Sequence, residues 1–269
     1  VLIRVCGNRA VLETVVNDGM LLEQSIDIAC TPHIVRVHNR DGRSGLARLL
    51  AELGRLSAAA FEVLIGDDDA LAKDVAEVAA ATCRHTSDFA LLNAAAHRVR
   101  DPETIRTWIA SGRKGNEAHD RLCSAAIAVC SDRVALHDLL SRADASDWRG
   151  YAQMGKGMLA EALERLVALD AAAELRAIAC RTPQFDGLTE NYTGKVLLFR
   201  IFDAVHDDTA EYRRMLVECP EELIPAVTEH FSTRVQRDDA ASADALLREV
   251  AITHPARAEA ITVALRDHA

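Results

Sequence analysis

The chain has 269 residues, of which 49% are hydrophobic, and this is enough for a continuous core without disulfides or metals. Its net charge of -10 opposes a phosphate backbone and its aromatic content of 4% leaves few base-stacking platforms, which argues against nucleic acid as the partner. No apolar run approaches the roughly 20 residues of a membrane-spanning helix, and a mean hydropathy of +0.00 argues against a disordered chain.

The seven cysteines form an odd set without a CxxC pair, which favours a reducing, cytoplasmic compartment. We expect them to be buried small hydrophobes, and we predict neither a metal site nor a cofactor. No secretion signal is visible after Val1. Basic residues are almost all arginine in an alanine-rich text, which suggests a GC-rich, bacterial genome.

The region 1–86 is expected to be an N-terminal helical cap or a separate subdomain. Within it, Ile34 to His38 reads either as a short strand or as a helix end before a turn, and we favour helix and turn. Arginines cluster around this turn, and a following helix N-terminus could use them to hold an anion; the alternative is a solvated turn. The candidate anion-binding residues are Arg36, Arg40 and Arg43.

From residue 87 onward the sequence repeats a unit of two helices separated by a short break that contains aspartate. The break residues are Asp101, Asp132, Asp170 and Asp208, separated by 31, 38 and 38 positions. Apolar residues follow the aspartate at four, seven and eight positions in three copies, and the copy at Asp170 needs a shift of one residue. The spacing predicts one helical hairpin per repeat.

Aspartate at each break is expected to cap the next helix, because its carboxylate accepts from free first-turn amides and complements the helix dipole. Pro102, directly after Asp101, is the proline expected in a first turn. Pro255 is expected to open the last helix in the same way. We therefore interpret these aspartates as structural rather than catalytic.

These segments, Leu91 to Ser111, Leu122 to Ala143, Leu159 to Thr182 and Val196 to Cys219, resemble HEAT-like and armadillo-like helical repeats. The resemblance is generic, covers about half of the chain, and implies an all-α fold of antiparallel helix hairpins stacked as an α-solenoid over residues 87–269. No ligand or activity follows from it, because the fixed motif positions of a particular repeat family are absent.

The longer connections between hairpins should lie on the edge of the stack opposite the aspartate breaks. Arginine and aromatic residues gathered there are what protein interfaces favour, although the aromatic rings could instead seal the hairpin junctions. The candidate partner-binding residues are Arg113, Lys114, Trp148, Arg149, Tyr151, Phe185 and Tyr192.

The sequence therefore favours a protein-binding scaffold or adaptor rather than an enzyme, since it contains neither an HExxH nor a GxSxG motif. Bacterial composition together with a repeat fold raises the hypothesis of an effector delivered into a host cell or a secretion-system component. Two alternatives stay open: a helical enzyme with its site near the 144–156 and 181–194 loops, and a helical-repeat nucleic-acid-binding protein.

Overall fold

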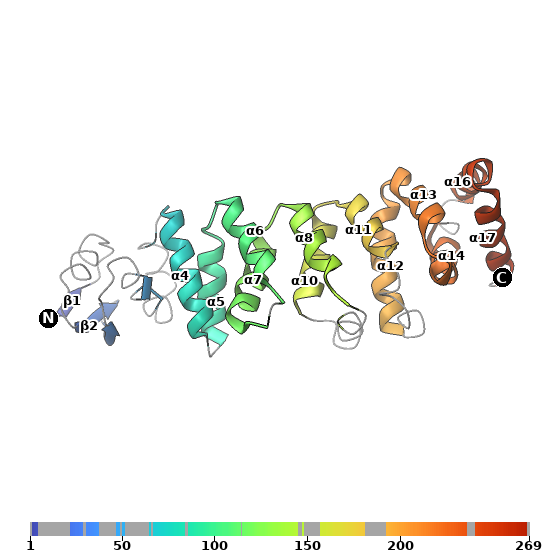
Figure 1. Cartoon of the computed structure of the whole chain (residues 1–269). Helices are drawn as coiled ribbons and strands as arrows, with labels where there is room; N and C mark the ends of the chain where they lie inside the picture. The colour runs from blue at the N-terminus through green and yellow to red at the C-terminus, as the bar shows by residue number, and fades with distance from the viewer. Residues whose placement is uncertain are drawn as a thin grey trace. The chain divides into compact units, whose positions relative to one another are not determined.

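The structure is a computed structural model of the whole chain (Figure 1). It describes residues 2–4, 22–28, 31–37, 47–48, 50–51, 65, 67–83, 86–113, 115–144, 147, 157–180, 192–235 and 240–267. The chain divides into two compact units, Val1–Cys130 and Ser131–Ala269, which we call unit 1 and unit 2. This division falls at 130/131, whereas the repeat pattern placed a boundary at 86/87.

Every regular element described from Asp69 onward is a helix, which confirms the helical class predicted from the apolar spacing. In unit 1 the helices are α4 (Asp69–Thr82), α5 (Thr86–Ala96), α6 (Pro102–Ser111) and α7 (Glu117–Val129). Unit 2 contains α8 (Arg133–Ser141), α10 (Met158–Ala168), α11 (Ala172–Ala179), α12 (Tyr192–His206), α13 (Thr209–Glu218), the 3-10 turn η1 (Glu221–Leu223), α14 (Ile224–His230), the π-helical turn η2 (Phe231–Val235), α16 (Ala240–Thr253) and α17 (Pro255–Asp267).

A three-stranded sheet near the N-terminus corrects the favoured prediction of a helix end at Ile34 to His38, since residues 34–37 belong to a strand; His38 and the turn that follows it lie outside the described residues. The sheet consists of β1 (Leu2–Arg4), β2 (Leu22–Ile28) and β3 (Thr31–Val37). β1 pairs in parallel with β2, and β2 pairs antiparallel with β3, with Ser25 opposite Ile34. The physical reason is that four of the seven residues of β3 are β-branched, a side-chain shape that a pleated strand accommodates better than a helix.

Acidic and amide side chains open the helices, as the sequence predicts. Asp101, Asp132 and Asp208 are the N-caps of α6, α8 and α13, and each accepts hydrogen bonds from first-turn backbone amides. Asp68 and Asn116 cap α4 and α7 in the same way. The prediction of capping is thus confirmed at three of the four repeated aspartates.

The fourth repeated aspartate, Asp170, is not an N-cap, and here the prediction was wrong. The N-cap of α11 is Ala171, and Asp170 has a φ of 51° in the left-handed region just after α10. The Ala171 amide donates to the Leu166 carbonyl and the Asp170 amide donates to the Val167 carbonyl. These two bonds form a Schellman motif, so the extra residue that shifts this repeat ends α10 instead of opening α11.

The apolar residues predicted at four, seven and eight positions after each aspartate are buried. They are Ile105, Trp108 and Ile109 in α6, Leu136, Leu139 and Leu140 in α8, and Tyr212, Met215 and Leu216 in α13. Leu175 and Ile178, the shifted positions of α11, are buried as well. The 3.6-residue period therefore placed the core correctly along these helices.

The pairing of helices differs from the hairpins drawn from the sequence. The most extensive packing of helices joins α4 with α5, α6 with α7, α8 with α10, α11 with α12 and α16 with α17. Three of these pairs flank a long connection, whereas the predicted hairpins flank an aspartate break. A capped break fixes where a helix starts, but which neighbouring helix its apolar face covers is decided by packing, and the spacing along one chain does not determine that choice.

Cys83, Cys123, Cys130 and Cys219 are buried, as expected for small hydrophobes, and Cys180 is half-buried. Burial raises the pKa of Cys219 to about 11 and that of Cys180 to about 12, so both thiols stay protonated near neutral pH. Of the helices that the structure describes, none is both long and apolar enough to cross a membrane.

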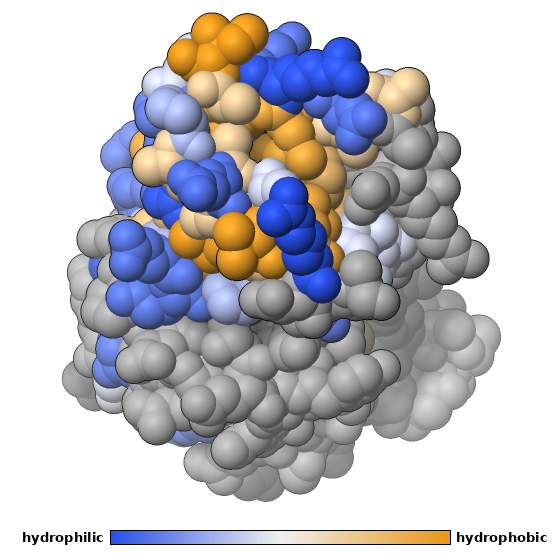
Figure 2. Space-filling model, turned by 90° about the vertical axis from the view of Figure 1, so that its right-hand side faces the viewer, coloured by the Kyte–Doolittle hydropathy of each residue, from blue (hydrophilic) through white to orange (hydrophobic). Residues whose placement is uncertain are grey.

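The C-terminal end of unit 2 presents a mixed surface. Figure 2 faces this end and shows apolar side chains gathered among strongly hydrophilic ones. Ile252 of α16 and Val263 of α17 are exposed, while Val250 and Ile261 on the same helices are buried. Each of these two helices thus places apolar side chains both in the core and in solvent.

Candidate functional site

Most of the predicted partner-binding residues lie outside the described residues. This holds for Lys114, Trp148, Arg149, Tyr151 and Phe185. Tyr192 is the first residue of α12, but its side chain is not described. The predicted rim therefore stays a prediction.

Arg113 is the one predicted rim residue whose surroundings are described. It has a φ of 64° and lies in the turn between α6 and α7, where its backbone amide donates to Asp120 Oδ1 at 2.6 Å. Gly115, with a φ of 75°, follows in the same turn. Arg113 is half-buried, so the structure gives it a place in the turn that joins the two helices.

The predicted anion site is likewise untested. Arg36 lies on β3, where its backbone is opposite Glu23 of β2, and its side chain is not described. Arg40 and Arg43 lie outside the described residues.

A groove on unit 1 is the feature that the structure adds. It has a volume of about 690 Å³ and is lined by residues from three helices of this unit. Helix α4 contributes Lys73, Glu77 and Ala81, and α7 contributes Ala118, His119 and Leu122. The remaining lining residues are Asp101, which is the N-cap of α6, and Glu103, Thr104, Thr107, Trp108 and Ser111 of α6. Because α7 packs against both α4 and α6, it joins the two other walls.

Polar contacts join the walls of the groove. Trp108 of α6 is only 3% exposed, and its indole Nε1 donates to Glu77 Oε1 of α4 at 3.4 Å. At the start of α4, Asp67 Oδ1 pairs with Arg100 Nη2 at 2.9 Å, directly before the cap of α6. At its other end, the Ala80 carbonyl accepts from Arg121 of α7 at 3.0 Å. These contacts frame the groove along the length of α4.

The rim of the groove is predominantly acidic. Glu77, Asp101 and Glu103 supply three carboxylates, and Lys73 supplies one ammonium group. Hydrogen bonds from the Thr104 hydroxyl and backbone amide hold the pKa of the Asp101 carboxyl below its usual value, so this group stays ionised. Buried Trp108 and Leu122 provide an apolar lining between these charges.

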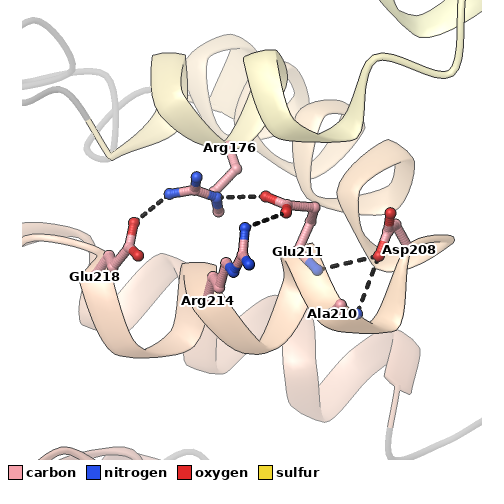
Figure 3. A network of polar contacts seen from close by, with 6 residues as sticks. All are labelled: Arg176, Asp208, Ala210, Glu211, Arg214 and Glu218. Carbon is pink, nitrogen blue, oxygen red and sulfur yellow. Dashed lines mark hydrogen bonds and ion pairs between the residues drawn. The ribbon is translucent and has the colours of Figure 1, made fainter.

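A second polar cluster lies in unit 2, between α11 and α13 (Figure 3). Glu211 accepts from Arg176 Nε at 2.7 Å and from Arg214 Nη1 at 2.8 Å, and Arg176 also pairs with Glu218. Burial alone would lower the pKa of Arg176, but the bond to Glu211 and the two carboxylate charges outweigh it and raise that pKa. The charged groups of this cluster pair with one another, so we interpret the cluster as a structural link between two helices rather than a ligand site.

A buried histidine links three helices of unit 2. His230 has no exposed surface; its Nε2 lies 2.9 Å from Asp203 Oδ1 and its Nδ1 lies 3.0 Å from the Tyr212 hydroxyl. A carboxylate oxygen accepts hydrogen bonds, so Nε2 is the donor in the contact with Asp203, and Nδ1 lies within hydrogen-bond distance of the Tyr212 hydroxyl. Burial raises the pKa of Tyr212, which keeps its hydroxyl a donor. Since Tyr212 is also inaccessible, this relay is part of the core.

The groove was not predicted from the sequence. Lys73, Glu77 and Ala81 follow one another at four-residue intervals, which places them on one face of a helix. The shared face of these three residues was visible in the sequence. Its packing beside α6 could not be predicted, because the region before residue 87 fits the repeat poorly. Trp108 and Asp101 were recognised only as a core residue and a cap.

Comparisons of the chain with protein-family models, with curated protein sequences and with solved structures find no significant match. Among the described residues, no three or more histidine, cysteine, aspartate or glutamate side chains gather where a metal ion could be held. The function is therefore inferred from the chain's own geometry.

Proposed function

We propose that this protein is an α-helical scaffold that binds a segment of another protein in the groove of unit 1. The observation that carries the proposal is the groove itself, which combines a buried tryptophan with a charged, exposed rim. Protein interfaces typically have this arrangement of an apolar centre and a polar rim. A groove between packed helices also suits the apolar face of a bound helix or an extended chain.

The repeated intervals between contacting residues support the α-solenoid part of the proposal. In unit 1, Trp108 contacts Glu77 across 31 positions. In unit 2, Arg200 pairs with Glu164 and Arg213 with Glu249, each across 36 positions. These intervals fall in the range of one predicted repeat, as expected if each repeat contacts the next.

The acidic rim favours a protein partner over a nucleic acid. The lining has three carboxylates and one lysine, and this excess of negative charge repels a phosphate backbone, as does the net charge of -10. The loops where the enzyme alternative places its site, 144–156 and 181–194, lie largely outside the described residues. As a bacterial effector or secretion-system adaptor, the protein would use this groove to hold its client.

Photo-crosslinking in cells tests the proposal. A photoreactive amino acid replaces Thr107, an exposed residue of the groove, and in a control chain it replaces Ala128, an exposed residue of α7 that does not line it. We expect a discrete protein adduct from position 107 and none from position 128. Equal adducts from both positions, or none from position 107 in any host, would contradict the proposal.

A further inference from the structure

The groove already contains one cation of the chain's own, placed among its carboxylates. Lys73 Nζ lies 3.9 Å from Glu77 Oε1, and the two side chains are 44% and 45% exposed. Hydrogen bonds from Thr104 are the main cause of the lowered pKa of Asp101, and the charge of Lys73 adds to it. Lys73 therefore lies within the electrostatic reach of both acidic walls.

From this arrangement we infer that the groove recognises a partner segment by an inserted arginine or lysine side chain, for which Lys73 is the built-in competitor. This inference rests on the proposed function and names the chemistry of its partner. The incoming cation takes the place of Lys73 beside Glu77, and Lys73 moves into solvent.

Charge complementarity selects this occupant. After Lys73 is displaced, Glu77, Asp101 and Glu103 remain as three carboxylates of the lining, of which Glu103 keeps an exposed ion pair with Arg106 at 3.7 Å. Asp101 is held ionised by Thr104, so the negative charge does not vanish by protonation near neutral pH. An acidic segment would meet repulsion at the same positions and from the whole chain's charge of -10.

The weak Lys73 to Glu77 pair makes the displacement feasible. Both partners are nearly half exposed and their separation of 3.9 Å is at the limit of an ion pair, so solvent already screens most of their attraction. The stem of an incoming arginine or lysine can lie along buried Leu122 and Trp108 while its charged head reaches the carboxylates. Arginine can in addition donate two parallel bonds to one carboxylate.

Fluorescence titration of the full chain tests this inference. Trp148→Phe leaves Trp108 as the only tryptophan, at the groove wall, and serves as the background for all variants. The probes are a short synthetic peptide that alternates arginine with leucine and its counterpart with glutamate in place of arginine. We expect the arginine peptide to change the Trp108 emission and to bind more weakly as salt rises.

Two substitutions should move the affinity in opposite directions. Glu77→Gln keeps an acceptor for Trp108 and should lower the affinity for the arginine peptide about fivefold. This factor corresponds to the energy of one ion pair near 4 Å in water. Lys73→Ala removes the competitor and should tighten the same peptide about threefold. The matched controls, Glu161→Gln and Arg266→Ala on exposed positions of α10 and α17, should leave the affinity unchanged.

The inference is overturned if the glutamate peptide binds as well as the arginine peptide, if neither binds, or if Lys73→Ala fails to tighten binding. A protein adduct at position 107 together with any of these results would leave the scaffold proposal standing and reject only the cationic partner. No adduct and no peptide binding would reject both.

Discussion

Glu211 of α13 joins this helix to α11 through a buried contact with Arg176. Its carboxylate accepts from Arg176 and Arg214, and the side chains of Glu211 and Arg176 are only 11% and 16% exposed. Glu218 pairs with the same Arg176 but is 49% exposed. The two carboxylates therefore share one partner and differ in burial, which makes them a matched comparison.

Glu211→Ala should lower the free energy of unfolding by at least about 2 kcal/mol, because it removes the buried carboxylate that accepts a hydrogen bond from the mostly buried Arg176. Glu218→Ala should lower it by less than about 1 kcal/mol, because an exposed ion pair contributes little. Urea denaturation followed by circular dichroism measures both. Equal losses for the two variants would show that burial does not set the strength of this cluster.

At the scale of one element, the ends of helices in unit 2 are set by aspartates with two different roles. Asp132 accepts from the amides of Val134 and Ala135 at the start of α8. Asp170 lies in the left-handed conformation at the end of α10 and contributes no side-chain cap to α11. The same residue type at equivalent positions of the repeat thus opens one helix and closes another.

Asp132→Ala should destabilise the protein by about 1 kcal/mol, because two first-turn amides lose their acceptor. Asp170→Gly should be neutral or stabilise it by up to about 1 kcal/mol, because glycine adopts a positive φ without strain. Thermal unfolding of both variants gives the comparison. A clear loss of stability in Asp170→Gly would indicate that its carboxylate caps a helix after all.

Much of the helical fold was predictable because the signals are local. The caps at Asp101, Asp132 and Asp208 and the buried apolar positions that follow them are determined within one turn or two of the chain. The role of Asp170 was not predictable, because one extra residue in this repeat moves the aspartate from the start of a helix to the end of the previous helix. The strand at Thr31–Val37 was missed because a run of β-branched residues this short fits either structure in the absence of its partner strand.

At the scale of the whole molecule, the site required information that the sequence does not contain. The groove joins Glu77 of α4 to Trp108 of α6, and this pairing of α4, α6 and α7 is a matter of packing within unit 1. The sequence pattern instead predicted a site at the long connections, where arginine and aromatic residues gather. A long connection is visible in a sequence, whereas a groove between helices appears only when their neighbours are known.

The central claim is that a protein partner occupies the groove of unit 1, and filling the groove tests it most directly. Ala81→Trp and Thr107→Trp place bulk on two exposed lining positions, and Ala128→Trp places the same bulk on α7 outside the groove. The measured quantity is the amount of the partner, as identified by crosslinking at position 107, that each variant retains. We predict that it falls at least about tenfold with either groove variant and is unchanged with Ala128→Trp. Retention that survives both groove variants in a folded chain would contradict the account.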